Sequence, residues 1–115
     1  MGLINLIFHI CSKSDWQKAI SKGYYEAESL KTEGFIHASR SEQVAHTANR
    51  IFRGKKNLLL LYIDAEKLKS ELKIEKANDL AEEFPHVYGP INIEAVFMAV
   101  DFPCDKNGIF HFKGL

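Results

Sequence analysis

Short runs of hydrophobic residues divide the chain into strands and helices. Asn57 to Asp64 (NLLLLYID) is apolar at nearly every position, which is typical of a central strand covered on both faces. Leu3 to Ile10 has the same character. The pattern predicts further strands at Gly34 to Ser39, Leu72 to Lys76 and Ile93 to Phe102.

Two capping boxes predict two helices. Ser14-Asp15-Trp16-Gln17 opens the first helix, with Ser14 as N-cap, and Gly23 ends it. Ser39-Arg40-Ser41-Glu42 opens the second, which Gly54 ends. Its core-facing stripe consists of Val44, Ala45, Ala48, Ile51 and Phe52.

The remaining segments predict irregular structure and one hairpin. Residues 65 to 70 form at most a helical turn, and residues 77 to 90 form a loop or short helix. Asn107-Gly108 favours a hairpin turn, so we expect the tail to pair back as an edge strand. Helices gather in the first half and strands in the second. We therefore predict one α+β domain, residues 1–115, with a mixed or mostly antiparallel sheet.

Charge argues against a nucleic-acid polymer as partner. Lys+Arg and Asp+Glu both count 15, so the formal net charge is zero. The cluster Arg50, Arg53, Lys55 and Lys56 is interpreted as a solvated helix end. A single nucleotide remains compatible with this composition.

The expected location is the cytoplasm. The two cysteines, Cys11 and Cys104, are too few for a disulfide framework and fit small thiols in a reducing compartment. The apolar start of the chain lacks a basic region before it and is too short to span a membrane, so we expect no membrane association.

Strand alternation singles out the first candidate site residues. His9 is a titratable group in an otherwise apolar strand. Phe35, His37 and Ser39 share one face of the second strand, where a ring, an imidazole and a hydroxyl suit a ligand wall. A structural role is an open alternative for each histidine, and Ser39 also serves as the predicted N-cap. His46 and His111 are expected at the surface.

The segment Phe-Pro-His-Val-Tyr-Gly-Pro at residues 84 to 90 carries the third candidate histidine, His86. Two prolines make it rigid, which fits either a functional loop or a buried hydrophobic plug. Glu75, before the segment that carries His86, and Glu94, at the start of the next strand, are the candidate carboxylates, and each also fits a surface charge. A zinc site on His9, His37 and His86 lacks supporting ligand spacing, so no metal is expected.

Two long strings, GFIHAS at residues 34 to 39 and FPHVYG at residues 84 to 89, resemble the family known as domain of unknown function 952, and the likeness covers nearly the whole chain. The residues that match its motifs are His9, Trp16, Gly23, Tyr25, Ser29, Leu30, Gly34, Phe35, His37, Ser39, Gln43, Glu75, Phe84, Pro85, His86, Tyr88 and Gly89.

That family resembles a divergent ADP-ribosyltransferase-like superfold, which implies a split sheet that grips NAD or an ADP-ribose-like nucleotide. The resemblance implies that His9 contacts the ribose, while Phe35, His37 and Ser39 lie near the nicotinamide. A glutamate would stabilise the charge that develops as the glycosidic bond breaks. Glu75 matches the family motif, whereas Glu94 fits the superfold topology.

The leading hypothesis is therefore an enzyme that carries out ADP-ribosyl transfer or related ribose-phosphate chemistry, with NAD as cofactor. The catalytic candidates are Glu75, His37 and His86. The ligand-binding candidates are His9, Tyr25, Phe35, Ser39 and Tyr88. The alternatives are a nucleotide-binding or small-ligand module without chemistry and, third, a metal-dependent hydrolase. The sequence leaves the acceptor and the oligomeric state open.

Overall fold

The computed structural model describes residues 5–76 and 81–113 as a small α+β domain with antiparallel sheets. Its helices are α1 (Lys13–Lys22), α2 (Glu28–Glu33) and α3 (Val44–Ile51). Its strands are β1 (Leu6–Ser12), β2 (Tyr24–Tyr25), β3 (Ile36–His37), β4 (Leu58–Asp64), β5 (Glu71–Lys76), β6 (Glu83–Tyr88), β7 (Ile91–Asn92) and β8 (Val96–Asp101). Short 3₁₀ turns lie at Ser41–Gln43, Ala65–Lys67 and Ile93–Ala95.

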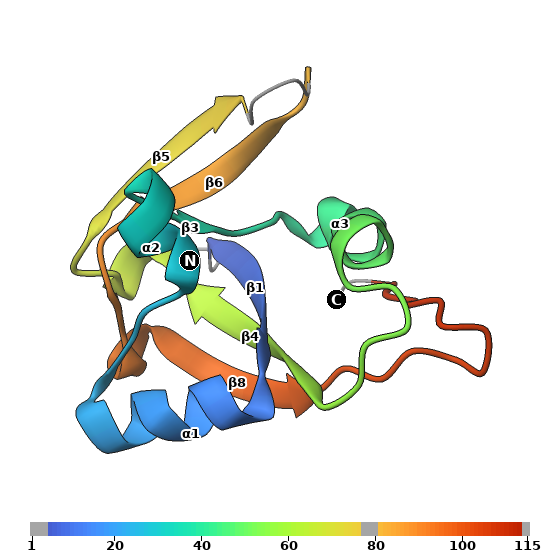
Figure 1. The fold of residues 1–115 in the computed structure, drawn as a ribbon. Helices are drawn as coiled ribbons and strands as arrows, with labels where there is room; N and C mark the ends of the chain where they lie inside the picture. The colour runs from blue at the N-terminus through green and yellow to red at the C-terminus, as the bar shows by residue number, and fades with distance from the viewer. Residues whose placement is uncertain (1–4, 77–80, 114–115) are drawn as a thin grey trace.

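The largest sheet has the order β1-β4-β8, so the predicted central position of β4 is confirmed. Both faces of the sheet are covered. Trp16 and Ala19 of α1 pack with alternate residues of β4, and Val44 and Ala48 of α3 pack with the residues between them. Figure 1 shows α1 and α3 on different sides of this sheet. The nearly continuous apolar pattern of β4 follows from this double burial.

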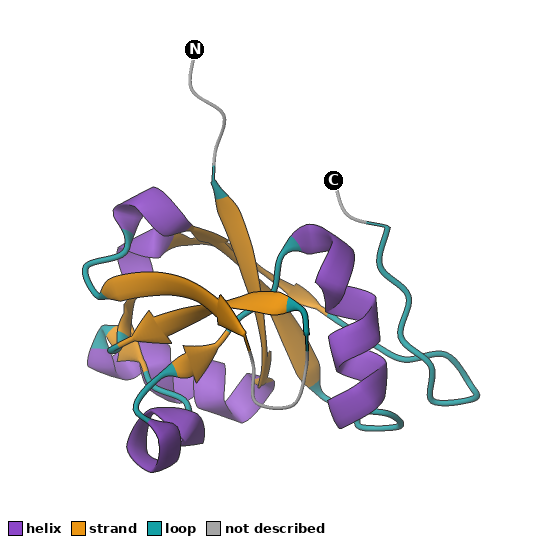
Figure 2. Ribbon diagram, turned by 90° about the horizontal axis from the view of Figure 1, so that it is seen from above, coloured by secondary structure: helices purple, strands orange, loops and turns teal. Residues whose placement is uncertain are grey.

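The second sheet, β3-β6-β5, carries the β5–β6 hairpin, and β2 pairs with β7 in a third. The hairpin extends away from the large sheet (Figure 1). Seen from above, the helices lie around the strands (Figure 2). Backbone hydrogen bonds join the two three-stranded sheets, because Phe8 and Ser39 exchange N–H to O bonds of 2.8 Å in both directions.

Both predicted helix starts are displaced. The N-cap of α1 is Ser12, whose hydroxyl accepts from the Asp15 amide at 3.1 Å, and the helix ends at Gly23 as predicted. Ser39 does not cap the second helix, because its backbone pairs with Phe8. The Gln43 side chain instead accepts from the Arg40 amide at 2.9 Å. In both cases a neighbouring strand decided between overlapping capping signals.

The segment predicted as a loop or short helix is the clearest error. Residues 83–88 form β6, the middle strand of its sheet, while residues 77–80 lie outside the described residues. Pro85 is tolerated there, since its carbonyl accepts from the Ala38 amide at 3.0 Å and proline has no N–H to leave unpaired. The apolar strand predicted from Ile93 begins at Val96, after a 3₁₀ turn.

The tail turns near Asn107 and Gly108, but residues 109–113 form no strand. Asn49 of α3 holds the tail through its side-chain amide, which accepts from the Phe110 N–H at 2.7 Å and donates to the Phe110 carbonyl at 3.0 Å. Side-chain anchoring therefore replaces the predicted strand pairing.

We expect Asn49→Ala to lower the free energy of unfolding by about 2 kcal/mol, because it leaves both backbone groups of Phe110 without partners. Urea unfolding at neutral pH measures this. Asn5→Ala, at an exposed position, is the matched control and should change the midpoint little. Equal stability of the two variants would contradict the proposed anchoring.

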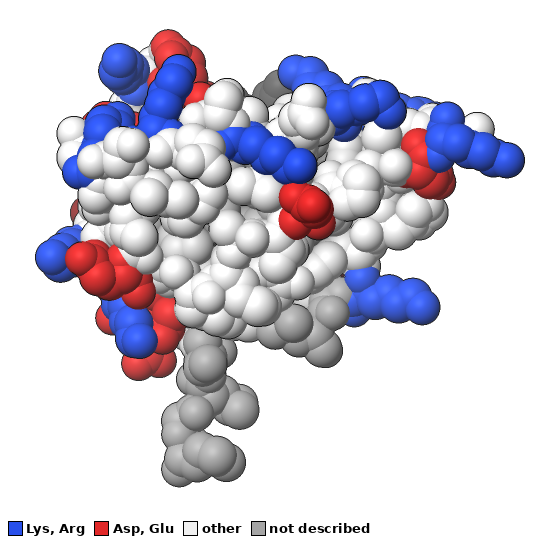
Figure 3. All heavy atoms as spheres, turned by 90° about the horizontal axis from the view of Figure 1, so that it is seen from below, with Lys and Arg blue, Asp and Glu red and all other residues white. Residues whose placement is uncertain are grey.

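The open edge of the large sheet is apolar. Phe97 and Met98 of β8 are 47% and 40% exposed. Seen from below, few charged side chains cross the middle of the face that carries β8 and α1 (Figure 3).

None of the described helices is long and apolar enough to cross a membrane.

Candidate functional site

A cavity of about 470 Å³ opens where the two three-stranded sheets separate. Ser39, which follows β3, pairs with Phe8 of β1. Beyond this point the two segments diverge, because the chain after Ser39 turns into α3. Strand alternation then directs the backbone groups of Ile10 to the same free edge as those of Phe8. The cavity therefore has free strand edge along one wall, and its size is usual for a small-molecule site.

His9 projects from β1 between Tyr25 and the backbone of His37. Its Nδ1–H donates to the His37 carbonyl at 2.5 Å, so its Nε2 accepts from the Tyr25 hydroxyl at 2.8 Å. Burial lowers the pKa of His9 to about 4. At neutral pH this imidazole is thus an uncharged, fixed hydrogen-bonding group.

Two neighbours of His9 are also held in their neutral forms. Burial raises the pKa of the Tyr25 hydroxyl, and the thiol of Cys11 and the carboxylate of Asp15 act in the same direction. Burial raises the pKa of Cys11 to about 12, with a further contribution from Asp15. Cys11 is a protonated thiol at physiological pH and unsuited to act as a nucleophile.

Three cations also line the cavity: Arg50, Lys55 and Lys56. Among the described residues, none of them forms an ion pair with a carboxylate. The sequence interpretation as a solvated helix end missed this placement. Arg53, from the same cluster, is absent from the lining. Helical spacing could not have separated them, because residues i and i+3 share a helix face and Arg53 follows the end of α3.

Hydroxyl groups complete the polar part of the lining. The Ser39 hydroxyl lies 3.5 Å from that of Thr47, and Ser12 and Ser29 also contribute. Most of the remaining wall is apolar and includes Phe8. A pocket that combines apolar walls, neutral hydrogen-bonding groups and cations suits an anion that carries an uncharged ring or sugar.

Four other predicted residues form a separate cluster on the β3-β6-β5 sheet. Glu75 accepts from His86 Nδ1 at 2.8 Å and also from the Tyr88 hydroxyl. The hydrogen bond from Tyr88, followed by that from His86, holds the pKa of Glu75 below its ordinary value. Phe35 stacks on His86 with ring centroids 4.1 Å apart and planes at 22°.

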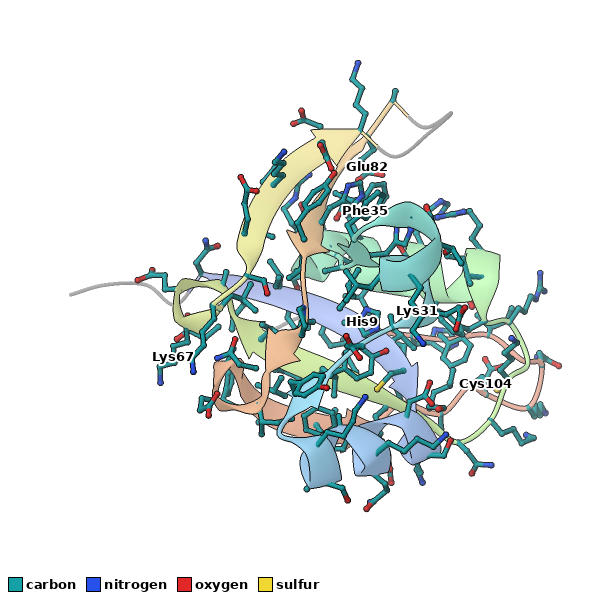
Figure 4. All side chains as sticks on the ribbon, turned by 60° about the vertical axis from the view of Figure 1, so that its left-hand side comes forward. His9, Lys31, Phe35, Lys67, Glu82 and Cys104 are labelled. Carbon is teal, nitrogen blue, oxygen red and sulfur yellow. The ribbon has the colours of Figure 1, made fainter. Side chains whose placement is uncertain are left out.

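The structure therefore divides the predicted site residues between two places. His9, Tyr25, His37 and Ser39 line the cavity, whereas Phe35, Glu75, His86 and Tyr88 do not. The expectation of one pocket around three histidines needs correction, because His86 lies outside the lining. His37 connects the two groups, since its ring centroid lies 5.4 Å from that of His86. Figure 4 shows Phe35 nearer to the β5–β6 hairpin than His9.

Glu94, His46 and His111 lie away from the cavity lining. Glu94 lies at the 3₁₀ turn before β8 and accepts from Asn92 at 3.2 Å. His46 and His111 are exposed, as predicted. In residues 5–76 and 81–113, no three His, Cys, Asp or Glu side chains are grouped closely enough to hold a metal ion.

The family model for proteins of unknown function DUF952 matches residues 10–99. The crystal structure of CC0527 from Caulobacter crescentus is similar, with 36% identity, a TM-score of 0.84 and coverage of 93% of this chain and 94% of that chain. A double mutant of CC0527 gives 35% identity and the same TM-score and coverage. Its solution NMR structure gives 37% identity, a TM-score of 0.79 and 90% coverage of both chains. No curated protein matches the chain. The chain belongs to the DUF952 family.

Proposed function

We propose that the cavity binds a small anionic ligand of the nucleotide class, with NAD or ADP-ribose as representatives. The observation that carries the proposal is the polarity of the cavity. The lining combines neutral hydrogen-bonding groups, His9 and Tyr25, with the cations Arg50, Lys55 and Lys56. Phosphates would contact the cations, and a sugar would contact the neutral groups.

The split between the sheets supports the same ligand class. The cavity follows the free edge of β1, where the backbone N–H of Ile10 can donate to a ligand oxygen. This arrangement suits the ADP-ribosyltransferase-like fold that the sequence resembles, and that fold assignment is part of the proposal. We place the ribose at His9, as the resemblance implies.

Binding without transfer is the form of the proposal that the geometry supports best. Transfer requires a carboxylate near the breaking bond, but Glu75 and Glu94 are both absent from the cavity lining, where Asp15 is the only acidic residue. The histidine–glutamate pair of His86 and Glu75 favours ADP-ribosyl transfer as a second candidate, because a carboxylate orients His86 as in acid–base sites. The described residues give the metal-dependent hydrolase no comparable support.

Binding should depend on the cations that line the cavity. We expect Arg50→Ala and Lys55→Ala each to weaken ADP-ribose binding by about tenfold, because each removes a charged phosphate contact from a partly dry site. Isothermal titration calorimetry at two salt concentrations measures both affinity and its electrostatic part. Higher salt should weaken binding to the wild type more than to the variants.

Arg53→Ala is the matched control, since Arg53 belongs to the same cluster of cations but lies outside the lining. It should leave the affinity within about twofold of the wild type, as expected for a screened surface charge. No heat and no thermal stabilisation with either NAD or ADP-ribose would contradict the proposed function. Incubation with NAD followed by an assay for free nicotinamide separates binding from transfer.

A further inference from the structure

The Glu75–His86 pair leaves one polar atom unexplained. His86 is 1% exposed, and its Nε2 has no hydrogen-bond partner among the described residues. Its Nδ1 carries the proton, because a carboxylate accepts and does not donate. Nε2 is therefore a buried acceptor without a donor, and native proteins seldom leave such an atom unpaired without a functional reason.

The position of the ring is firmly fixed. Glu75 accepts from Nδ1 and is itself held by the Tyr88 hydroxyl, and Phe35 stacks on one face of the ring with centroids 4.1 Å apart. A loosely placed ring would turn to find a partner, but this ring cannot turn without losing the bond to Glu75. The unpaired atom is thus imposed by the surrounding contacts.

The strand register places the His86 ring next to the cavity wall. Its Nδ1 is hydrogen-bonded to Glu75 of β5, and β3 lies on the other side of β6. The cross-strand neighbour there is His37, with planes at 79° and centroids 5.4 Å apart. His37 lines the cavity, and so does Phe84, which shares the strand face of His86. His86 therefore lies directly behind the cavity wall that His37 forms.

The wall that separates Nε2 from the cavity is weakly held. The His37 side chain is 45% exposed, and its Nε2 contacts the carboxylate of Glu33 at 3.1 Å. The Glu33 side chain is itself 40% exposed. Such solvent-exposed pairs contribute little, so a bound ligand can displace this imidazole at small cost.

We infer that His86 Nε2 is a further ligand contact at the inner end of the cavity, where it accepts a hydrogen bond from a ligand hydroxyl group. The hydroxyl reaches Nε2 when the His37 ring swings toward solvent. The inference rests on the proposed function and narrows the ligand class, since the ligand must present a hydroxyl, as a sugar does, next to the ring of Phe35. Glu75 and Tyr88 are positioning residues that fix the tautomer and the ring.

Two substitutions separate the two nitrogens of His86. In His86→Asn, the amide nitrogen replaces Nδ1 and still donates to Glu75, but nothing replaces Nε2. His86→Gln extends an amide oxygen toward the Nε2 position. With ADP-ribose as probe, we expect His86→Asn to weaken binding about tenfold and His86→Gln to weaken it less than about threefold. His46→Asn, at an exposed histidine outside the lining, should bind as the wild type does.

Imidazole nitrogen NMR gives a readout that a structural role would not change. The free protein should show His86 with a protonated Nδ1 and an unprotonated Nε2, and saturation with ADP-ribose should shift the Nε2 signal. Equal binding by His86→Asn and wild type, or an Nε2 signal that saturation leaves in place, would overturn the His86 contact alone. Wild-type protein that binds no ADP-ribose would overturn the proposed function and the His86 contact together.

Discussion

The protein should lose about 3 kcal/mol of unfolding free energy as the pH falls from 7 to 4 because of His9 alone. Burial lowers the pKa of this imidazole in the folded state to about 4, from an ordinary value of 6.5. Between these values the unfolded chain binds a proton that the folded protein does not bind. Stability is therefore full above pH 6.5 and decreases as the pH falls toward 4.

Loss of solvation is the main reason why protonation of His9 is costly, and the hydrogen bond from Nδ1 to the His37 carbonyl offsets part of this cost. The hydroxyl of Tyr25 already occupies Nε2. A proton on Nε2 forces the Tyr25 hydroxyl to reverse from donor to acceptor. The charge of His37 disfavours a second positive charge, and the carboxylate of Asp15 offsets only part of the loss of solvation.

Urea unfolding from pH 7.5 to 4.5 measures this loss, and the window ends where most carboxylates begin to titrate. In His9→Asn the amide donates to the His37 carbonyl but does not titrate, so stability should change much less over the window. His46→Asn removes an exposed imidazole and should keep the full wild-type slope. An unchanged slope in His9→Asn would show that other groups cause the acid sensitivity.

The elements that periodicity predicted best are those whose burial repeats along the chain. The residues of β4 alternate between two cores, so an unbroken apolar run was a sufficient signal for a central strand. The end of α1 was equally clear, because Gly23 has φ of 93°, a conformation that glycine adopts at low cost.

The errors arose where a distant partner decided the local structure. Pro85 argued against a strand, but β6 pairs with β5, the preceding strand, on one side and with β3, which is remote in sequence, on the other. In the same way, Ser39 had a strong capping pattern that its pairing with Phe8 overrode. Local propensities are weak compared with such tertiary contacts.

The candidate site was predictable in its residue types but not in its arrangement. Strand alternation put His37 and Ser39 on a shared face, and both line the cavity. Strand alternation could not show that the Glu75–His86 pair lies behind the cavity wall formed by His37, since the pair depends on the register of β5 against β6. The contribution of Lys55 and Lys56 to the cavity was missed because their cluster was interpreted only as the solvated end of a helix.

Phe110→Ala should lower the free energy of unfolding by about 4 kcal/mol, although Phe110 lies in an irregular tail. The side chain is 1% exposed and packs with Phe102, its centroid 5.1 Å away, in the core that includes Phe8 and Tyr62. Its removal leaves a cavity between α3 and the large sheet. For a small domain this is a large share of a total stability of roughly 5–15 kcal/mol.

Denaturant unfolding, with the midpoint and slope fitted together, measures the effect. Ile74→Ala is the control, because Ile74 is 47% exposed on β5 and its truncation should cost less than about 0.5 kcal/mol. The double variant with Asn49→Ala tests how the tail is held. Asn49 and the phenyl ring fix the same residue. The two single variants together should therefore lose more unfolding free energy than the double variant does. A loss near 1 kcal/mol for Phe110→Ala would show instead that the tail packs loosely on a core that is complete without it.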